Sequence, residues 1–205
     1  MDLAEYQRAL ARNFIVYCDG ITDVSHVAET MAKEYGLRFQ VPTPTEDIEK
    51  VNDAVKKAGE TLQRKLSHPM VYLQSLQRNN GDYLQWNYRL IAKGRTIFAF
   101  GHLERDCQSL RGGTGWSVQM ALEMEKDVFV YDIESSTWFR AVRVYPNVKF
   151  CAWPHLTVLD QNSAIIGSMS VGCFTINEIR NLFHRTFCEA DNLQDIVKAL
   201  KEFEL

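Results

Sequence analysis

Short apolar runs recur along this chain and predict β-strands. Residues 13–18 are rich in β-forming residues and end at Asp19-Gly20, a dipeptide typical of turns, and residues 37–41 form a second short run. Residues 96–100, 128–131 and 164–166 are apolar without alternation. Such runs are typical of strands that are buried on both faces, as in a parallel sheet.

Between these runs, apolar residues recur every three or four positions and predict helices. The clearest predicted helix begins with a capping box in which Thr43 is the N-cap, Pro44 occupies the first helical position and Glu46 the third. One apolar stripe follows, formed by Ile48, Val51, Val55, Ala58, Leu62 and Leu66. The same periodicity predicts helices at about 24–35, from 71 toward 90 with a break at 79–81, and at 114–125, 175–187 and 193–203.

Strands that alternate with helices from end to end predict the fold class. We expect an α/β protein with a doubly wound, mainly parallel sheet, a Rossmann-like three-layer sandwich. The 205 residues fit one domain, and no repeat or linker divides them. The expected unit is therefore residues 1–205.

Composition and charge exclude several classes of protein. Hydrophobic residues make up 46% and charged residues 24%, which excludes a disordered or fibrous chain. The 23 basic and 26 acidic residues give a net charge of −3, so no strong field favours nucleic acid. No apolar run reaches the ~18 residues of a membrane helix, and the N-terminus does not resemble a signal peptide. We expect a cytoplasmic protein that contacts neither nucleic acid nor membrane.

The five cysteines and five histidines indicate no metal site. The cysteines form no CxxC pair and the histidines form no HxH or HExxH pair. We therefore expect no metal ion and no cofactor, and we expect the cysteines to be reduced.

A glycine-rich segment is the strongest candidate for a ligand site. Gly112, Gly113 and Gly115 lie within four positions, and helical periodicity follows them. Ligands of open parallel sheets bind beyond the carboxyl ends of the strands, and this segment follows the predicted strand that ends at Gly101. Free N–H groups and the positive end of the helix dipole favour phosphate there, with Thr114 and Ser117 as additional donors.

Two other interpretations of the glycines remain open. The segment is not a Walker loop, because no Lys follows the glycines. It resembles a degraded dinucleotide fingerprint, with Val118 where a third glycine belongs and Asp132 nineteen residues after Gly113. It also fits a structural turn that binds nothing.

Gly112-Gly113-Thr114-Gly115 at a helix start, followed by the strand-like segment 126–132, resembles the LOG/DprA-like (SLOG) Rossmannoid group. That group includes phosphoribohydrolases labelled "lysine decarboxylases" and molybdenum-cofactor carrier proteins. The resemblance covers about 84–132, with a weaker patch at 164–185 in which Gly167-Ser168 resembles the group's strand ending in Gly-Ser. It implies binding of a nucleotide or nucleoside phosphate, and a homodimer is common in the resembled proteins.

The chain departs from the resembled phosphoribohydrolases at the catalytic acids. Their glycine loop continues into two glutamates, whose places fall here at about Val118 and Gln119. Gln119 can hydrogen-bond a ribose or a base but has no pKa suited to general-base catalysis. The next acid, Glu123, lies one helical turn further on, where we expect an exposed side chain. The departure puts hydrolysis in doubt and leaves binding intact.

Neighbouring residues complete the predicted site. Asn87 and Arg89 precede the central strand, and an arginine there can pair with phosphate, although both residues equally fit a surface or dimer contact. Trp116 either stacks on a base or packs beneath the loop. The predicted ligand-binding residues are Gly101, Gly112, Gly113, Thr114, Gly115, Trp116, Ser117, Gln119, Asp132, Gly167, Ser168, Asn87 and Arg89.

The sequence therefore favours binding of a nucleotide or nucleoside phosphate without the hydrolytic acid. The first alternative is an N-glycosidase of the phosphoribohydrolase type that uses a displaced acid, for which Glu104, Asp106 and Glu123 are candidates. The second alternative is a scaffold or interaction protein that has lost the ligand. A homodimer is compatible with all three.

Overall fold

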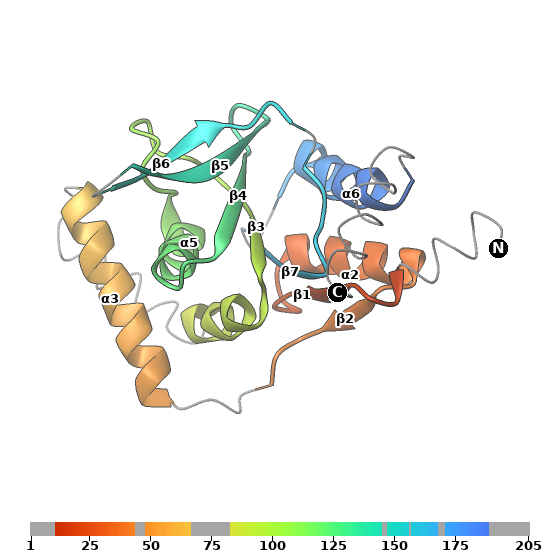
Figure 1. Ribbon diagram of the computed structural model, residues 1–205, viewed down its shortest axis with the longest axis horizontal. Coiled ribbons are helices and arrows are strands. Elements are labelled where there is room, and N and C mark those ends of the chain that lie inside the picture. Colours follow the sequence, from red (N-terminus) through yellow and green to blue (C-terminus); the bar gives the residue numbers. More distant parts are fainter. Residues whose placement is uncertain are drawn as a thin grey trace, which may run out of the picture.

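The structure is a computed structural model of the 205-residue chain and describes residues 11–43, 48–66, 83–144, 147–155, 157–167 and 171–188. These residues form a seven-stranded sheet with helices on both faces (Figure 1). The strands lie in the order β2-β1-β7-β3-β4-β5-β6. Their bounds are β1 (Ile15–Tyr17), β2 (Arg38–Gln40), β3 (Thr96–Gly101), β4 (Asp127–Asp132), β5 (Thr137–Val144), β6 (Asn147–Ala152) and β7 (Asn162–Gly167).

Five of the strands are parallel. β2, β1, β7, β3 and β4 pair in parallel, whereas β4–β5 and β5–β6 are antiparallel. Every residue of β3 is buried, because β3 lies in the middle of the sheet and helices cover both of its faces. The prediction of an α/β, mainly parallel, Rossmann-like sandwich is confirmed.

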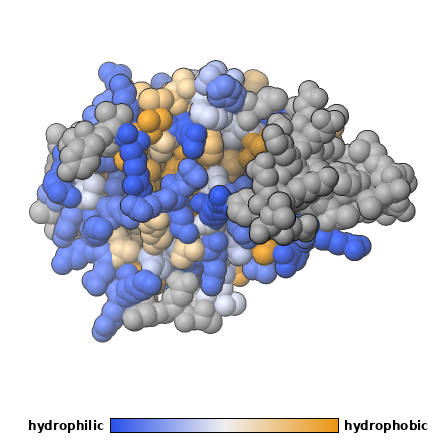
Figure 2. Space-filling model, in the orientation of Figure 1, coloured by the Kyte–Doolittle hydropathy of each residue, from blue (hydrophilic) through white to orange (hydrophobic). Residues whose placement is uncertain are grey.

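Two hydrophobic clusters separate the helices into two layers. One cluster joins the sheet to α3 (Ile48–Leu66), to the helix over residues 83–93 and to α5 (Gly112–Glu123). The other joins the opposite face to α2 (Asp23–Tyr35) and α6 (Cys173–Cys188). α5 is buried along most of its length between the sheet and α3, and the outer side of α3 is mainly hydrophilic (Figure 2).

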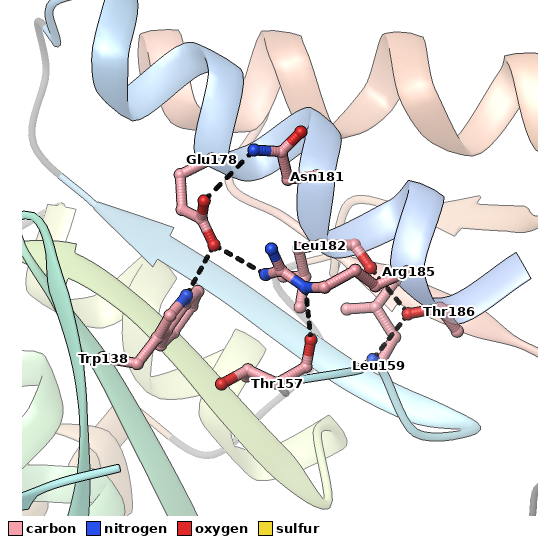
Figure 3. A network of polar contacts seen from close by, with 8 residues as sticks. All are labelled: Trp138, Thr157, Leu159, Glu178, Asn181, Leu182, Arg185 and Thr186. Atoms are coloured by element: carbon pink, nitrogen blue, oxygen red, sulfur yellow. Dashed lines mark hydrogen bonds and ion pairs between the residues drawn. The ribbon is translucent and has the colours of Figure 1, made fainter. Parts of the chain in front are cut away.

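Polar contacts add to the apolar packing of α6 (Figure 3). The Glu178 carboxylate accepts hydrogen bonds at 2.6 Å from the Trp138 indole of β5 and at 2.6 Å from the Arg185 guanidinium. Arg185 also donates to the carbonyl of Thr157, at 3.1 Å. The Glu178–Arg185 pair is 14% exposed on both sides, so α6 is joined to β5 and to the segment before β7 through a mostly buried charge pair.

Several predicted details need correction. The antiparallel β5–β6 hairpin was not predicted, and α5 begins at Gly112 rather than Thr114, so the glycines form its first turn. Along the predicted stripe of α3, Val51, Val55, Ala58 and Leu62 are buried, but Ile48 is 48% exposed. The capping box from Pro44 to Glu46, the break at 79–81 and the helix predicted at 193–203 lie outside the described residues. No described helix is both long and apolar enough to cross a membrane.

The order of the strands creates a switch point between β7 and β3. These strands are parallel neighbours, but the helix that follows β7, α6, lies on one face and the helix that follows β3, α5, lies on the other. Their carboxyl ends, Gly167 and Gly101, therefore mark the place where connections diverge. In open α/β sheets this is where ligands bind.

Candidate functional site

The first turn of α5 begins beside this switch point with free backbone donors. Arg111, the N-cap residue, supplies no side-chain hydrogen bond to the turn. Within the described part of the chain, no hydrogen bond occupies the N–H groups of Gly112, Gly113 or Thr114, and the first amide engaged is that of Gly115, which donates to the Arg111 carbonyl at 3.3 Å. Three unpaired N–H groups at a helix start are suited to an anion.

The start of α2, which follows β1, is closed by its own side chains. The Asp19 carboxylate accepts hydrogen bonds from the N–H groups of Ile21 and Thr22, at 2.8 and 2.9 Å. The Thr22 hydroxyl accepts from the N–H of Ser25, whose own hydroxyl accepts from the N–H of Gly20. The α2 helix itself begins at Asp23, and among its first three N–H groups that of Ser25 has a side-chain partner, whereas none of the first three at α5 has a hydrogen-bond partner among the described residues.

The glycines of α5 are required for different reasons. Gly112 has a φ of +68°, a left-handed conformation that favours glycine, and a Cβ there would meet no atom within 4 Å. A Cβ on Gly115 would lie 1.8 Å from the carbonyl oxygen of Leu110, so only glycine fits against the preceding loop. Gly112 thus leaves open space at the helix start, whereas Gly115 serves packing.

A polar cluster lies beside this turn. Asn87, which is fully buried, donates from Nδ2 to the Ser117 hydroxyl at 2.8 Å, and Ser117 donates to the Gly113 carbonyl at 3.0 Å. The Oδ1 atom of Asn87 has no partner among the described residues. Tyr83 approaches Gly113 and donates its hydroxyl to the Gly167 carbonyl at 2.8 Å. These contacts bring the predicted residues Asn87, Ser117, Gly113 and Gly167 together.

Asp132, at the end of β4, braces the loop between β3 and α5. Its Oδ1 accepts from the N–H of Leu103 and its Oδ2 from the N–H of Ser135, both at 2.9 Å. Burial raises the pKa of Asp132, but these hydrogen bonds outweigh burial and hold the pKa below its usual value. Both carboxylate oxygens are therefore engaged by N–H groups of the protein and are not directed at a ligand.

Trp116 and Gln119 turn away from the first turn of α5 toward α3. Trp116 is 2% exposed and its indole donates to the Val55 carbonyl at 2.8 Å, so it packs against α3 and is not placed to stack on a ligand. The Gln119 Oε1 atom accepts from Lys65 at 2.9 Å, and its Nε2 donates to Glu123. Both side chains serve the α3–α5 interface.

The remaining predicted residues lie in different surroundings. Arg89 is buried with its guanidinium 5.6 Å from the centre of the Trp86 ring, which is a contact within its own helix. Gly101 lies beneath the loop, because a Cβ there would be 3.2 Å from Leu110 and 3.3 Å from Thr114. Ser168 lies outside the described residues.

The three candidate acids have different partners. Glu104 lies 3.5 Å from the Arg111 guanidinium and is thus next to the start of α5. Asp106 accepts a hydrogen bond from the N–H of Gln108, within the same loop. Glu123 accepts from Thr61 of α3 at 2.9 Å and is only 16% exposed, so the expectation of an exposed side chain was wrong.

Sequence reasoning missed two residues of this region. The hydroxyl of Tyr83 reaches Gly167 of β7, which lies 84 positions further along the chain. The hydrophobic pattern around Tyr83 does not indicate so distant a contact. Arg111 precedes the glycines directly and is a cation beside a predicted anion site, a signal that could have been used. Its guanidinium lies 3.5 Å from Glu104 and 4.0 Å from Glu134.

Among the described residues, no group of three or more His, Cys, Asp or Glu side chains is arranged to hold a metal ion. Comparison of the chain with protein-family models, with curated proteins and with solved structures found no match.

Proposed function

We propose that this protein binds the phosphate group of a nucleotide or nucleoside phosphate at the first turn of α5. One observation carries the proposal: the N–H groups of Gly112, Gly113 and Thr114 have no partner in the described part of the chain, whereas the start of α2 is capped. Unsatisfied donors at a helix start are stabilised by an anion, and the helix dipole acts in the same direction.

The surroundings of the turn support a phosphate. Gly112 leaves space that a side chain would otherwise occupy, and Arg111 is the N-cap residue, with nearly half of its side chain exposed. Arginine pairs with phosphate through two parallel hydrogen bonds. The guanidinium is paired with the Glu104 and Glu134 carboxylates, and a phosphate would compete with them.

The nucleotide class rests on the SLOG resemblance and on the position of the turn at the switch point. The dinucleotide interpretation is less well supported, because residues 102–111 separate the glycines from β3, whereas that fingerprint follows its strand directly. A scaffold protein would leave the same three donors to water, because the first N–H groups of any helix lack intrahelical partners, so the binding of a ligand separates the two interpretations.

One observation keeps the N-glycosidase alternative in view. Of the three candidate acids, Glu104 lies beside the start of α5, although its carboxylate is engaged by Arg111 at 3.5 Å. Release of free base from a nucleoside monophosphate, abolished by Glu104→Gln, would support that activity. Release that survives Glu104→Gln would exclude Glu104 as the acid.

Thermal unfolding with a panel of ligands tests the proposal. Inorganic phosphate, nucleoside monophosphates and the corresponding nucleosides are compared at equal concentrations. A ligand present at 100 times its Kd should stabilise the protein by about 2.7 kcal/mol. We expect stabilisation by the phosphorylated members and little by the nucleosides. No response to any phosphorylated compound would favour the scaffold alternative.

A further inference from the structure

Tyr83 bridges the two sides of the switch point. Its side chain comes from the helix over residues 83–93, and its ring carbon Cε1 would lie 3.1 Å from a Cβ on Gly113 of α5. At the far end of the ring, the hydroxyl donates to the carbonyl oxygen of Gly167 at 2.8 Å, at the end of β7. One phenol thus contacts the first turn of α5 and the neighbouring strand end simultaneously.

The phenol is held as a neutral hydrogen-bond donor. Burial, followed by the negative charge of Asp19, raises the pKa of Tyr83 to about 12, although hydrogen bonding with Asn87 and Thr114 acts in the opposite direction. Tyr83 therefore keeps its proton at neutral pH and donates a hydrogen bond to the Gly167 carbonyl. The space at Gly112 is not filled by Tyr83, since no atom lies within 4 Å of a Cβ there.

We propose that Tyr83 is a specificity-determining residue that separates free phosphate from phosphate esters. A free anion can occupy the open side at Gly112 while the phenol stays between Gly113 and Gly167. In this proposal the organic group of an ester extends along the switch point, where ligands of open α/β sheets bind, and the phenol lies there. Binding of an ester therefore requires the Tyr83 side chain to rotate and its bond to Gly167 to break. This inference rests on the proposed phosphate site.

The groups behind Tyr83 indicate which ester suits the site. When the phenol moves, the Gly167 carbonyl loses the hydrogen bond from Tyr83, and the Asn87 amide and the Thr114 hydroxyl lose a neighbour. The lost hydrogen bond costs free energy, so the favoured ester is one whose organic group donates a hydrogen bond in place of the phenol. The hydroxyl groups of a sugar phosphate meet this requirement, whereas a purely apolar ester does not.

Calorimetric titration of the full chain with inorganic phosphate and with ribose 5-phosphate tests the inference. Tyr83→Phe keeps the ring and removes only the bond to Gly167. Because a typical hydrogen bond contributes ~0.5–1.5 kcal/mol, this change should raise the affinity for ribose 5-phosphate about two- to tenfold. The affinity for inorganic phosphate should not change. Tyr35→Phe is the matched control, because that hydroxyl faces His184 and Cys188 on the α2–α6 side.

Each outcome decides the matter. The role of Tyr83 is overturned, while the phosphate site stands, if Tyr83→Phe does not raise the affinity for ribose 5-phosphate relative to the affinity for inorganic phosphate. If neither compound binds the unmodified chain, Tyr83→Phe or Tyr83→Ala, the proposed function fails and this inference fails with it. A rise in the affinity for ribose 5-phosphate that occurs in Tyr83→Phe and is absent in Tyr35→Phe supports the inference.

Discussion

Gly112 and Gly36 have nearly the same φ angle, and both have space where a Cβ would lie. Their φ angles are +68° and +72°, and a Cβ on either would meet no atom within 4 Å. Gly36 ends α2, where its N–H donates to helix carbonyls, whereas Gly112 begins α5 beside the proposed anion. The pair therefore allows the strain of a left-handed residue to be separated from an effect on binding.

Gly112→Ala and Gly36→Ala should destabilise the protein to a similar extent, by about 1–2 kcal/mol, because both place a Cβ on a left-handed residue. Only Gly112→Ala should weaken phosphate binding, since its methyl group projects into the space proposed for the anion. Urea unfolding measures the first effect and calorimetric titration the second. Equal phosphate affinities in the two variants would argue against the site at Gly112.

The sequence predicted which residues gather near the glycines better than it predicted where their side chains point. Thr114, Ser117 and Asn87 do lie at the first turn of α5. Trp116 and Gln119 do not face the site, because α3 packs against α5 and takes up both side chains. Local spacing carries no information on which helix lies next to α5.

At the scale of elements, α6 depends on both apolar and charged contacts. Its buried side chains pack on the sheet, and Glu178 and Arg185, seven positions apart on one side of the helix, form the pair that reaches Trp138 and Thr157 (Figure 3). A charge pair that is mostly removed from water contributes little net stability when intact, but the loss of one partner leaves the other poorly solvated.

Glu178→Gln should therefore lower the free energy of unfolding by about 3 kcal/mol, because the Arg185 guanidinium keeps its position but loses its carboxylate. Lys33→Ala is the control, since it removes an ion pair with Glu29 in which the lysine is 70% exposed. The free energy of unfolding should fall by less than ~1 kcal/mol in Lys33→Ala. Urea denaturation compares the two variants, and similar losses would show that the α6 pair is effectively solvated.

The strands of the parallel part were predictable and the hairpin was not. The central residues of β3, β4 and β7 form uninterrupted apolar runs because both faces are covered. In β5, apolar residues point to both faces, Trp138 to one and Phe139 to the other, while Arg140 and Arg143 interrupt the run. Such a segment shows neither strict alternation nor an unbroken run, and its pairing with β4 and β6 is set by contacts distant in sequence.

At the scale of the whole molecule, the candidate site is a product of strand order. Gly101 and Gly167 are 66 positions apart, yet β3 and β7 are direct neighbours because β7 inserts between β1 and β3. Hydrophobic periodicity identifies strands but does not order them, so the meeting of Tyr83, Gly113 and Gly167 was not predictable from the sequence. The fold class was predictable from the sequence, since it follows from the alternation of strands and helices alone.

The central claim is tested most directly by following the backbone amide resonances of the ¹⁵N-labelled full chain during titration with a nucleoside monophosphate. We expect the resonances of Gly112, Gly113 and Thr114 to shift most and to saturate together, because their N–H groups receive the phosphate. The capped amides of Ile21 and Thr22 should shift little. Saturable shifts elsewhere on the protein, with these three resonances unchanged, would contradict the account.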